Sequence, residues 1–179
     1  SRADLLLQED TMQVLANSGL EEVWIGAESG SQLILDAMDK GTKVEQIQEA
    51  RRVLKSVGVR VGFFLQFGYL GETEDDISKT IEMVKNLIPD DIGVSVSYPL
   101  PGTVFYEKVK DDLKNKSNWT DSDDLDLMFE NTYKPAYYKK LHRYVHKVFR
   151  THQGLENLKL MLTGSIKINK KASRSVLAT

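Results

Sequence analysis

Cysteine is absent from all 179 residues of the sequence. Its absence excludes disulfides, thiolate zinc sites and ordinary cysteine-ligated iron-sulfur clusters from this chain. Long apolar runs are missing as well, since none approaches the roughly 20 residues needed to span a bilayer. Residues 1–4 also lack the basic start and apolar core of a signal peptide. We therefore expect a cytoplasmic protein without a membrane span.

Charge of one sign is not in excess either. The 24 Lys and Arg residues are balanced by 26 Asp and Glu residues, which gives a formal net charge of -2. Because no basic field is present to attract phosphate backbones, nucleic acid is not expected as a partner. At 179 residues the chain is long enough for one domain with a good core and too short for two full-sized catalytic domains.

The histidines offer one candidate metal site. His142 and His146 are four residues apart and share one face of a helix, a spacing that can bind a metal ion. No glutamate occupies the metalloprotease position, and several tyrosines lie nearby. A partly exposed helical face is therefore favoured over a metal site.

Three segments rich in apolar and β-branched residues predict strands: residues 22–27, 59–67 and 92–98. The middle segment is almost continuously apolar, as expected where both faces of a strand are covered. The connections are long enough only for parallel pairing by crossover. We predict an α/β fold, either half of a β/α barrel or an open sheet. Three parallel strands cannot close a barrel and would expose apolar edges, so we expect the chain to be incomplete.

Helical periodicity surrounds these strands. The pairs Thr42 with Glu45 and Thr73 with Asp76 have capping-box spacing, and Gly58 is expected to end the helix before the second strand. The predicted helices cover residues 8–17, 32–39, 42–58, 73–88 and 104–113.

The sequence divides into a barrel part (residues 1–114), a polar linker (115–135) and a helical tail (136–179). Alternating acids in the linker resemble a calcium loop, but the turn glycine and the terminal glutamate are missing, so a solvated linker is favoured. The tail helix is expected to run from Ala136 toward Gly154, and the basic end of the chain to be disordered.

Tyrosines gather at the start of the tail. Tyr133, Tyr137 and Tyr138 could line a substrate cavity or pack the tail helix on the barrel, and packing is favoured.

Parallel β/α folds place their sites at the carboxyl ends of strands. The first strand ends at Glu28, which lies between small residues and is followed by Ser29. The backbone can approach a ligand there, and the carboxylate can accept hydrogens from hydroxyl or ammonium groups. An equally good interpretation is that Glu28 pairs with a neighbouring lysine or caps the next helix.

The other two strand ends are also unusual. Alternation puts Gln66 on the same side of its strand as Phe64, where an amide needs a partner. Gly68 and Gly71 then precede a helix whose first backbone donors could meet an anion, although a tight turn explains the glycines equally well. Tyr98 and two prolines close the third strand; they could form a rigid wall for a flat ring, but a plain terminator is favoured.

Four strings in this order carry a family resemblance: WIGAESGS at residues 24–31, LDAMDKG at 35–41, FGYLGET at 67–73 and YPLPGT at 98–103. Together they resemble the second half of the radical S-adenosylmethionine barrel, and closely its cobalamin-binding branch, which includes anaerobic porphyrin-ester cyclases and several methyltransferases. Leu70 departs from the proline usual between the two glycines. The resemblance implies a partial TIM-type β/α barrel with a helical carboxy-terminal extension.

The resemblance also implies an S-adenosylmethionine site along the strand ends. Glu28 would contact the ribose or the amino group, and Lys40 would face the methionine carboxylate. Gly68 would back the adenine, and Tyr98 would form a wall. The candidate cofactor-binding residues are Glu28, Ser29, Lys40, Gln66, Gly68 and Tyr98; no residue is assigned to catalysis.

Two further cofactors follow from the resemblance. In the family, a 4Fe-4S cluster held by three cysteines reduces the sulfonium and releases a 5′-deoxyadenosyl radical, and cobalamin sits in a separate amino-terminal domain. We expect both to be bound by segments missing from this chain, namely the amino-terminal barrel half and a cobalamin-binding domain. The chain alone would then not perform the radical step. The complete enzyme would act on an unactivated carbon of a small-molecule substrate, by methyl transfer or by radical oxidation such as cyclisation.

Three alternatives remain open. The chain could belong to another radical branch, such as the methylthiotransferases or the coproporphyrinogen-type oxidases. It could be a non-catalytic module that keeps the barrel half as a scaffold for a partner protein. A piece of an unrelated β/α hydrolase or aldolase is the weakest alternative, because Ser29 has no histidine near it in sequence.

Overall fold

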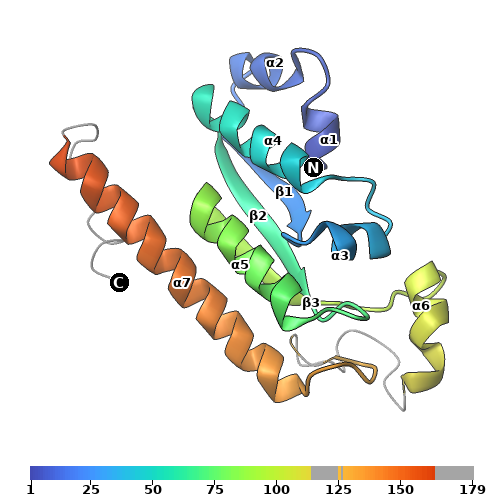
Figure 1. Ribbon diagram of the computed structural model, residues 1–179. Coiled ribbons are helices and arrows are strands. Elements are labelled where there is room, and N and C mark those ends of the chain that lie inside the picture. Colours follow the sequence, from blue (N-terminus) through green and yellow to red (C-terminus); the bar gives the residue numbers. More distant parts are fainter. Residues whose placement is uncertain (114–124, 126, 164–179) are drawn as a thin grey trace.

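A three-stranded parallel sheet lies at the centre of the computed structural model, which describes residues 1–113, 125 and 127–163 (Figure 1). The strands are β1 (Glu22–Glu28), β2 (Arg60–Phe67) and β3 (Asp91–Val96), and β2 lies between the other two. Phe63 is opposite Ile25 on one side and Ile92 on the other. The predicted α/β class and parallel strand order are confirmed.

Helices occupy both connections between the strands, and further helices precede β1 and follow β3. They are α1 (Ala3–Leu6), α2 (Thr11–Asn17), α3 (Gln32–Ala37), α4 (Val44–Ser56), α5 (Glu74–Leu87), α6 (Val104–Val109), the short 3-10 helix η1 (Lys110–Asp112) and α7 (Pro135–Leu162). Among the described helices, none has both the length and the apolar character that crossing a membrane requires.

The two predicted capping boxes have different outcomes. Thr73 caps α5: its backbone N–H donates to Asp76 at 3.0 Å, and the Asp76 N–H donates back to the Thr73 hydroxyl at 3.4 Å. At α4 the prediction is wrong by one residue, because Lys43 is the N-cap and its N–H donates to the Gln46 side chain at 2.8 Å. The Gln46 side chain therefore takes the capping role that was predicted for Glu45.

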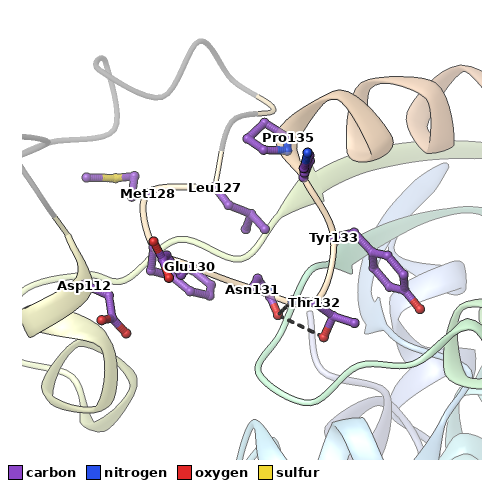
Figure 2. A pocket seen from close by; sticks show the side chains of 10 residues that line it. Asp112, Leu127, Met128, Glu130, Asn131, Thr132, Tyr133 and Pro135 are labelled. Atoms are coloured by element: carbon purple, nitrogen blue, oxygen red, sulfur yellow. Dashed lines mark hydrogen bonds between the residues drawn. The ribbon is translucent and has the colours of Figure 1, made fainter.

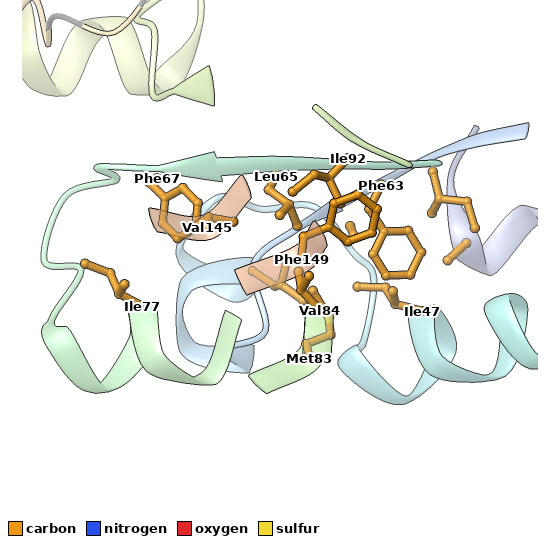
Figure 3. Close-up of a cluster of buried hydrophobic side chains, with 14 of the residues drawn as sticks. Ile47, Phe63, Leu65, Phe67, Ile77, Met83, Val84, Ile92, Val145 and Phe149 are labelled. Atoms are coloured by element: carbon orange, nitrogen blue, oxygen red, sulfur yellow. The ribbon is translucent and has the colours of Figure 1, made fainter. Parts of the chain in front are cut away.

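The core lies between the sheet and the helices on one of its faces (Figure 3). Phe63 and Phe67 of β2 point toward α4, α5 and α7, where they meet residues such as Val84 and Phe149. The opposite face is open within the described part of the chain, and Phe64 there is 51% exposed. Coverage of β2 on both faces, expected from its apolar sequence, is therefore wrong for the described residues.

Two aromatic rings fill the middle of the open face. Trp24 and Phe64 lie with ring centroids 4.7 Å apart. They rest on glycines of the neighbouring strands, because a Cβ on Gly62 would lie 2.5 Å from the Trp24 ring and one on Gly93 would lie 3.1 Å from the Phe64 ring. The rings thus cover the sheet below the strand ends, and polar side chains follow at those ends.

Helix α7 is longer than predicted and belongs to the same core. It continues through Gly154 to Leu162, because Gly154 keeps a helical backbone and is buried, not left-handed as a helix cap would be. A glycine inside a helix costs only about 1 kcal/mol, which the surrounding residues offset. Val145 and Phe149 of α7 pack in the same cluster as Phe63 of β2, so the tail and the barrel part share one core.

Three residues of the segment 115–135, which was assigned as a polar linker, are buried. Leu127, Met128 and Phe129 are each 5% exposed and belong to the main core cluster, and the division into a barrel part, a linker and a tail stays a prediction. Tyr138 is 2% exposed in the same cluster, which confirms packing as its role. The linker and calcium-loop interpretations of residues 115–124 and 126, and the predicted disorder after residue 163, lie outside the described residues.

Candidate functional site

The end of β1 brings a carboxylate to the edge of the sheet. Glu28 has a backbone φ of 56°, in the left-handed region that residues with a Cβ rarely adopt, and the pairing of β1 with β2 is irregular between Gly26 and Glu28. The carboxylate folds back over the strand, and a Cβ on Gly26 would lie 2.9 Å from Glu28 Oε1. Gly26 therefore makes the room that the Glu28 side chain occupies.

Lys40 faces this carboxylate from the far end of α3. Its Nζ donates to Glu28 Oε1 at 3.1 Å, and the side chains of Lys40 and Glu28 are 40% and 16% exposed. Left-handed residues on both sides of Lys40, Asp39 (φ 54°) and Gly41 (φ 62°), turn the chain back toward the strand end. The pairing of Glu28 with a lysine, left open from the sequence, is thus present, and the pair is still accessible to solvent.

Ser29 is not part of this cluster of side chains. It is 0% exposed, and its hydroxyl lies 3.1 Å from that of Thr80 on α5. Gly30 and Ser31 are held on the same helix: the Gly30 N–H donates to Thr80 at 2.9 Å, and the Ser31 hydroxyl donates to Asp76 at 2.6 Å. The structure therefore uses Ser29 to fasten the loop to α5.

Gln66 has the partner that its position demanded. Its Nε2 donates to the Ser97 hydroxyl at 3.0 Å, which joins the ends of β2 and β3. Tyr98 follows directly and is partly buried against the core cluster. The register places Leu65 beside Glu28, so the next residue, Gln66, lies between the first and third strand ends.

The turn after β2 is held by its own side chains. Gly68 has φ 77°, and its N–H donates to Glu72 Oε2 at 2.6 Å. The Thr73 N–H donates to Asp76, and three acidic residues occupy the first turn of α5. These donors are already satisfied and the local charge is negative, so the possibility of an anion site at this helix start is not supported.

Glu72 is a residue that sequence reasoning missed. It is 1% exposed, and burial raises its pKa to about 7. Burial also raises the pKa of Tyr138, and the nearby Glu72 carboxylate adds to that rise. Among the described residues, neither Glu72 Oε1 nor the Tyr138 hydroxyl has a hydrogen-bond partner. The sequence did offer a signal. Glu72 lies between Gly71 and Thr73, and because Thr73 already caps α5, the acid at position 72 is not needed as a cap.

Asn131 was missed as well. Its Nδ2 donates to the Gly68 carbonyl at 2.6 Å, from 63 residues further along the chain. It belongs to the stretch 127–135 that, with Asp112, lines a cavity of about 600 Å³ beside the turn (Figure 2). No local sequence pattern predicts the contact between Asn131 and Gly68, because the two residues are 63 positions apart.

The histidines do not gather further ligands. The rings of His142 and His146 lie 4.5 Å apart, and burial lowers the pKa of His146. Within residues 1–113, 125 and 127–163, no group of three or more metal-ligating side chains is present.

Part of the chain is similar to a known superfamily. Residues 2–84 match the radical SAM superfamily, whose name stands for radical S-adenosylmethionine. We call these matching residues the radical SAM segment. The radical SAM segment contains Glu28, Lys40, Gln66 and Gly68, and it ends inside α5. Tyr98 lies beyond it.

Several curated relatives align with the radical SAM segment and the residues after it. The chain is 34% identical over 97 residues to a provisionally named methylthiotransferase of Methanocaldococcus jannaschii, covering 54% of this chain and 22% of the relative. It is 27% identical over 111 residues to the anaerobic magnesium-protoporphyrin IX monomethyl ester cyclase of Rubrivivax gelatinosus, covering 62% and 20%. It is 31% identical over 101 residues to the tRNA-2-methylthio-N(6)-dimethylallyladenosine synthase of a Sulfurihydrogenibium species, covering 54% and 23%. The chain thus spans about a quarter or less of these relatives.

A solved structure shows the same fold. Elp3 of the archaeon Methanocaldococcus infernus superimposes with a TM-score of 0.54 at 24% identity, over 60% of this chain and 26% of Elp3. The likeness is one of fold alone, and it confirms the predicted partial β/α barrel.

Proposed function

We propose that this chain supplies one side of the S-adenosylmethionine site of a radical SAM enzyme. The observation that carries the proposal is the ion pair between Glu28 and Lys40 at the end of β1, inside the segment that matches the superfamily. The Gly68 turn would back the adenine, Gln66 would lie between the strand ends, and Tyr98 would form a wall. Ser29 would act only through the loop that it fastens.

The chemistry of the pair fits the methionyl end of the ligand. That end is a zwitterion, with an ammonium that needs an acceptor and a carboxylate that needs a donor. Glu28 offers carboxylate oxygens as acceptors, and Lys40 offers an ammonium with three donors, of which one is bonded to Glu28. Both side chains are partly exposed. A zwitterion placed between them would exchange one weak, solvent-screened ion pair for two charge-assisted hydrogen bonds.

The remaining cofactors would be held elsewhere in the whole protein. The superfamily uses a 4Fe-4S cluster to reduce bound S-adenosylmethionine, and this cysteine-free chain offers no thiolate ligands for one. We place the cluster in the amino-terminal half of the barrel and cobalamin in a separate domain. The role of this chain in the whole protein would be to bind and orient S-adenosylmethionine.

For the whole enzyme, we propose the cobalamin-binding branch, with methyl transfer or oxidative cyclisation at an unactivated carbon of a small molecule. The alignment with the Rubrivivax cyclase over 62% of this chain supports that choice. The methylthiotransferases are the second candidate, supported by relatives at 34% and 31% identity. Cobalamin bound by the anaerobically purified full-length protein would favour the first, and methylthiolation of a tRNA adenosine would favour the second.

The site itself is tested by titrating S-adenosylmethionine into the full-length protein by calorimetry. Glu28→Gln and Lys40→Met should each weaken binding about 10- to 100-fold, the effect of one lost charge-assisted hydrogen bond. Glu45→Gln, on the exposed first turn of α4, is the matched control and should bind as the wild type does. A wild-type protein that does not bind S-adenosylmethionine would leave the non-catalytic scaffold as the better explanation.

A further inference from the structure

Both main-chain polar groups of Gly68 are bonded to side chains, and the two side chains come from opposite directions. The N–H donates to Glu72, which lies in the same turn, at 2.6 Å. The carbonyl accepts from Asn131 Nδ2, also at 2.6 Å, although Asn131 lies 63 residues further along the chain. The N–H belongs to the peptide group before the Gly68 Cα and the carbonyl to the peptide group after it, so the two side chains orient the peptide planes on both sides of this Cα.

The amide of Asn131 is itself oriented by its neighbour. The Thr132 N–H donates to Asn131 Oδ1 at 2.8 Å, and the Thr132 hydroxyl donates to the same oxygen at 3.5 Å (Figure 2). With its oxygen occupied in this way, the amide presents its nitrogen to the Gly68 carbonyl. The Asn131 oxygen therefore accepts from Thr132, and the Asn131 nitrogen donates to Gly68.

Two apolar side chains from the same part of the chain close over Gly68. A Cβ on this residue would lie 3.0 Å from a Leu127 methyl carbon and 3.2 Å from the Tyr138 ring. Leu127, Asn131 and Tyr138 thus form a clasp on the turn, and we use that name for these three residues. The turn is also tied to the end of α3, because the Tyr69 hydroxyl donates to the Ala37 carbonyl at 2.7 Å.

We infer that Asn131 is a positioning residue for the adenine side of the S-adenosylmethionine site, and that the clasp makes ligand affinity depend on residues 127–138. This inference rests on the proposed function, which places the adenine against the Gly68 turn. Asn131 does not touch the ligand. It acts through the Gly68 carbonyl, whose orientation fixes the surface that the ring would meet.

Asn131→Asp in the full-length protein isolates this contact. Aspartate keeps the oxygen that accepts from Thr132 and replaces the donor to Gly68 with a second oxygen, which repels the carbonyl. Asn86→Asp, on the exposed side of α5, makes the same change of charge away from the turn and is the matched control. If Asn131→Asp does not fold, Asn131→Ser is measured instead, since its hydroxyl is too short to reach Gly68.

The probes are S-adenosylmethionine, 5′-deoxyadenosine and methionine, each titrated separately. Asn131→Asp should weaken both adenine-containing ligands about 10-fold and leave methionine within about twofold, because one hydrogen bond is lost at one end of the site. Hydrogen exchange of residues 68–73 should become faster in this variant and not in the control. A general loss of structure would instead weaken all three ligands alike.

The outcomes separate the two proposals. If Glu28→Gln weakens methionine binding while Asn131→Asp leaves 5′-deoxyadenosine binding unchanged, the proposed function stands and the positioning role of Asn131 is wrong. If the wild type binds none of the three probes, both proposals are wrong. Unchanged exchange at residues 68–73 in Asn131→Asp would also overturn the clasp.

Discussion

Lys40 donates to the Glu28 carboxylate at 3.1 Å, and the chain reaches this pair through left-handed residues at Glu28 itself and at Asp39. Such backbone costs about 1 kcal/mol or more for each residue that carries a Cβ. Glu28 leads directly into the loop that α5 fastens through Ser29 and Gly30, whereas Asp39 lies in the turn after α3. The surrounding contacts thus hold two strained turns that bring opposite charges together, as is common at ligand sites.

Gly26→Ala should damage the site without unfolding the protein. The new Cβ would lie 2.9 Å from Glu28 Oε1, and a carboxylate at the end of a flexible side chain can move aside. We expect a stability change below about 1 kcal/mol and about 10-fold weaker binding of S-adenosylmethionine, measured by denaturation and calorimetry.

Gly30→Ala provides the contrast to that substitution. Its Cβ would lie 2.4 Å from the Lys79 carbonyl oxygen, which belongs to the backbone of α5 and cannot move alone. We expect destabilisation of about 1–3 kcal/mol from overpacking. Equal stability of the Gly26 and Gly30 variants would contradict this account of the β1–α3 loop.

Arg51 should matter far more to stability than its neighbour Arg52. The Arg51 side chain is 6% exposed, pairs with Asp90 at 3.0 Å and donates to the Ile88 carbonyl at 2.8 Å, at the left-handed end of α5. Arg51→Met should cost about 2–3 kcal/mol, less than for a fully buried pair because Asp90 can be rehydrated.

The control is Arg52→Met. The Arg52 side chain is 68% exposed and pairs with Glu49 on the same helix surface, so its loss should leave the denaturation midpoint nearly unchanged. Urea denaturation of the two variants gives the comparison, and similar midpoints would show that the buried guanidinium does not hold the end of α5.

Glu72 should make stability fall as the pH rises. Its folded-state pKa of about 7 lies above the roughly 4.3 of an unfolded chain, so the folded state binds the extra proton between these values. The stability that protonation provides is complete below about pH 4 and is lost as the pH rises through about 7, a contribution of roughly 4 kcal/mol. Denaturant midpoints at about pH 5 and about pH 8 measure it.

Glu72→Gln is the variant for that experiment. Glutamine can still accept from the Gly68 N–H and does not titrate, so this component of the pH dependence should disappear. A buried amide without a partner costs about 1–3 kcal/mol at every pH, so the shape of the profile and not its height is compared. Parallel profiles for wild type and variant would mean that Glu72 ionises normally.

Helix α7 should be an integral part of the fold. Phe149 is 0% exposed and packs in the cluster that contains Phe63, so Phe149→Ala should cost about 3–5 kcal/mol. Leu162→Ala, at a position 81% exposed on the same helix, should change stability by less than about 0.5 kcal/mol. If Phe149→Ala unfolded only the tail, as followed by hydrogen exchange, α7 would be a separate unit.

Local sequence was enough for the elements and for part of the site. The three strands, the helices between them and the Thr73 cap follow from short-range periodicity and turn chemistry, which depend on residues close along the chain. The resemblance placed Glu28 and Lys40 in one site, and the structure pairs them. The need of Gln66 for a partner followed from its position on an alternating strand, but the identity of Ser97 did not.

Packing decided the rest, because it joins residues that no short pattern relates. Ser29 looked like a ligand residue, but its hydroxyl is buried against Thr80, 51 positions away. Glu72 gained its raised pKa only from burial, and Asn131 reached Gly68 only because α7 joins the core of the sheet. The chemical groups of the strand-end edge could be read along the chain, but which of them face a ligand and which fasten the loops depends on contacts made in three dimensions.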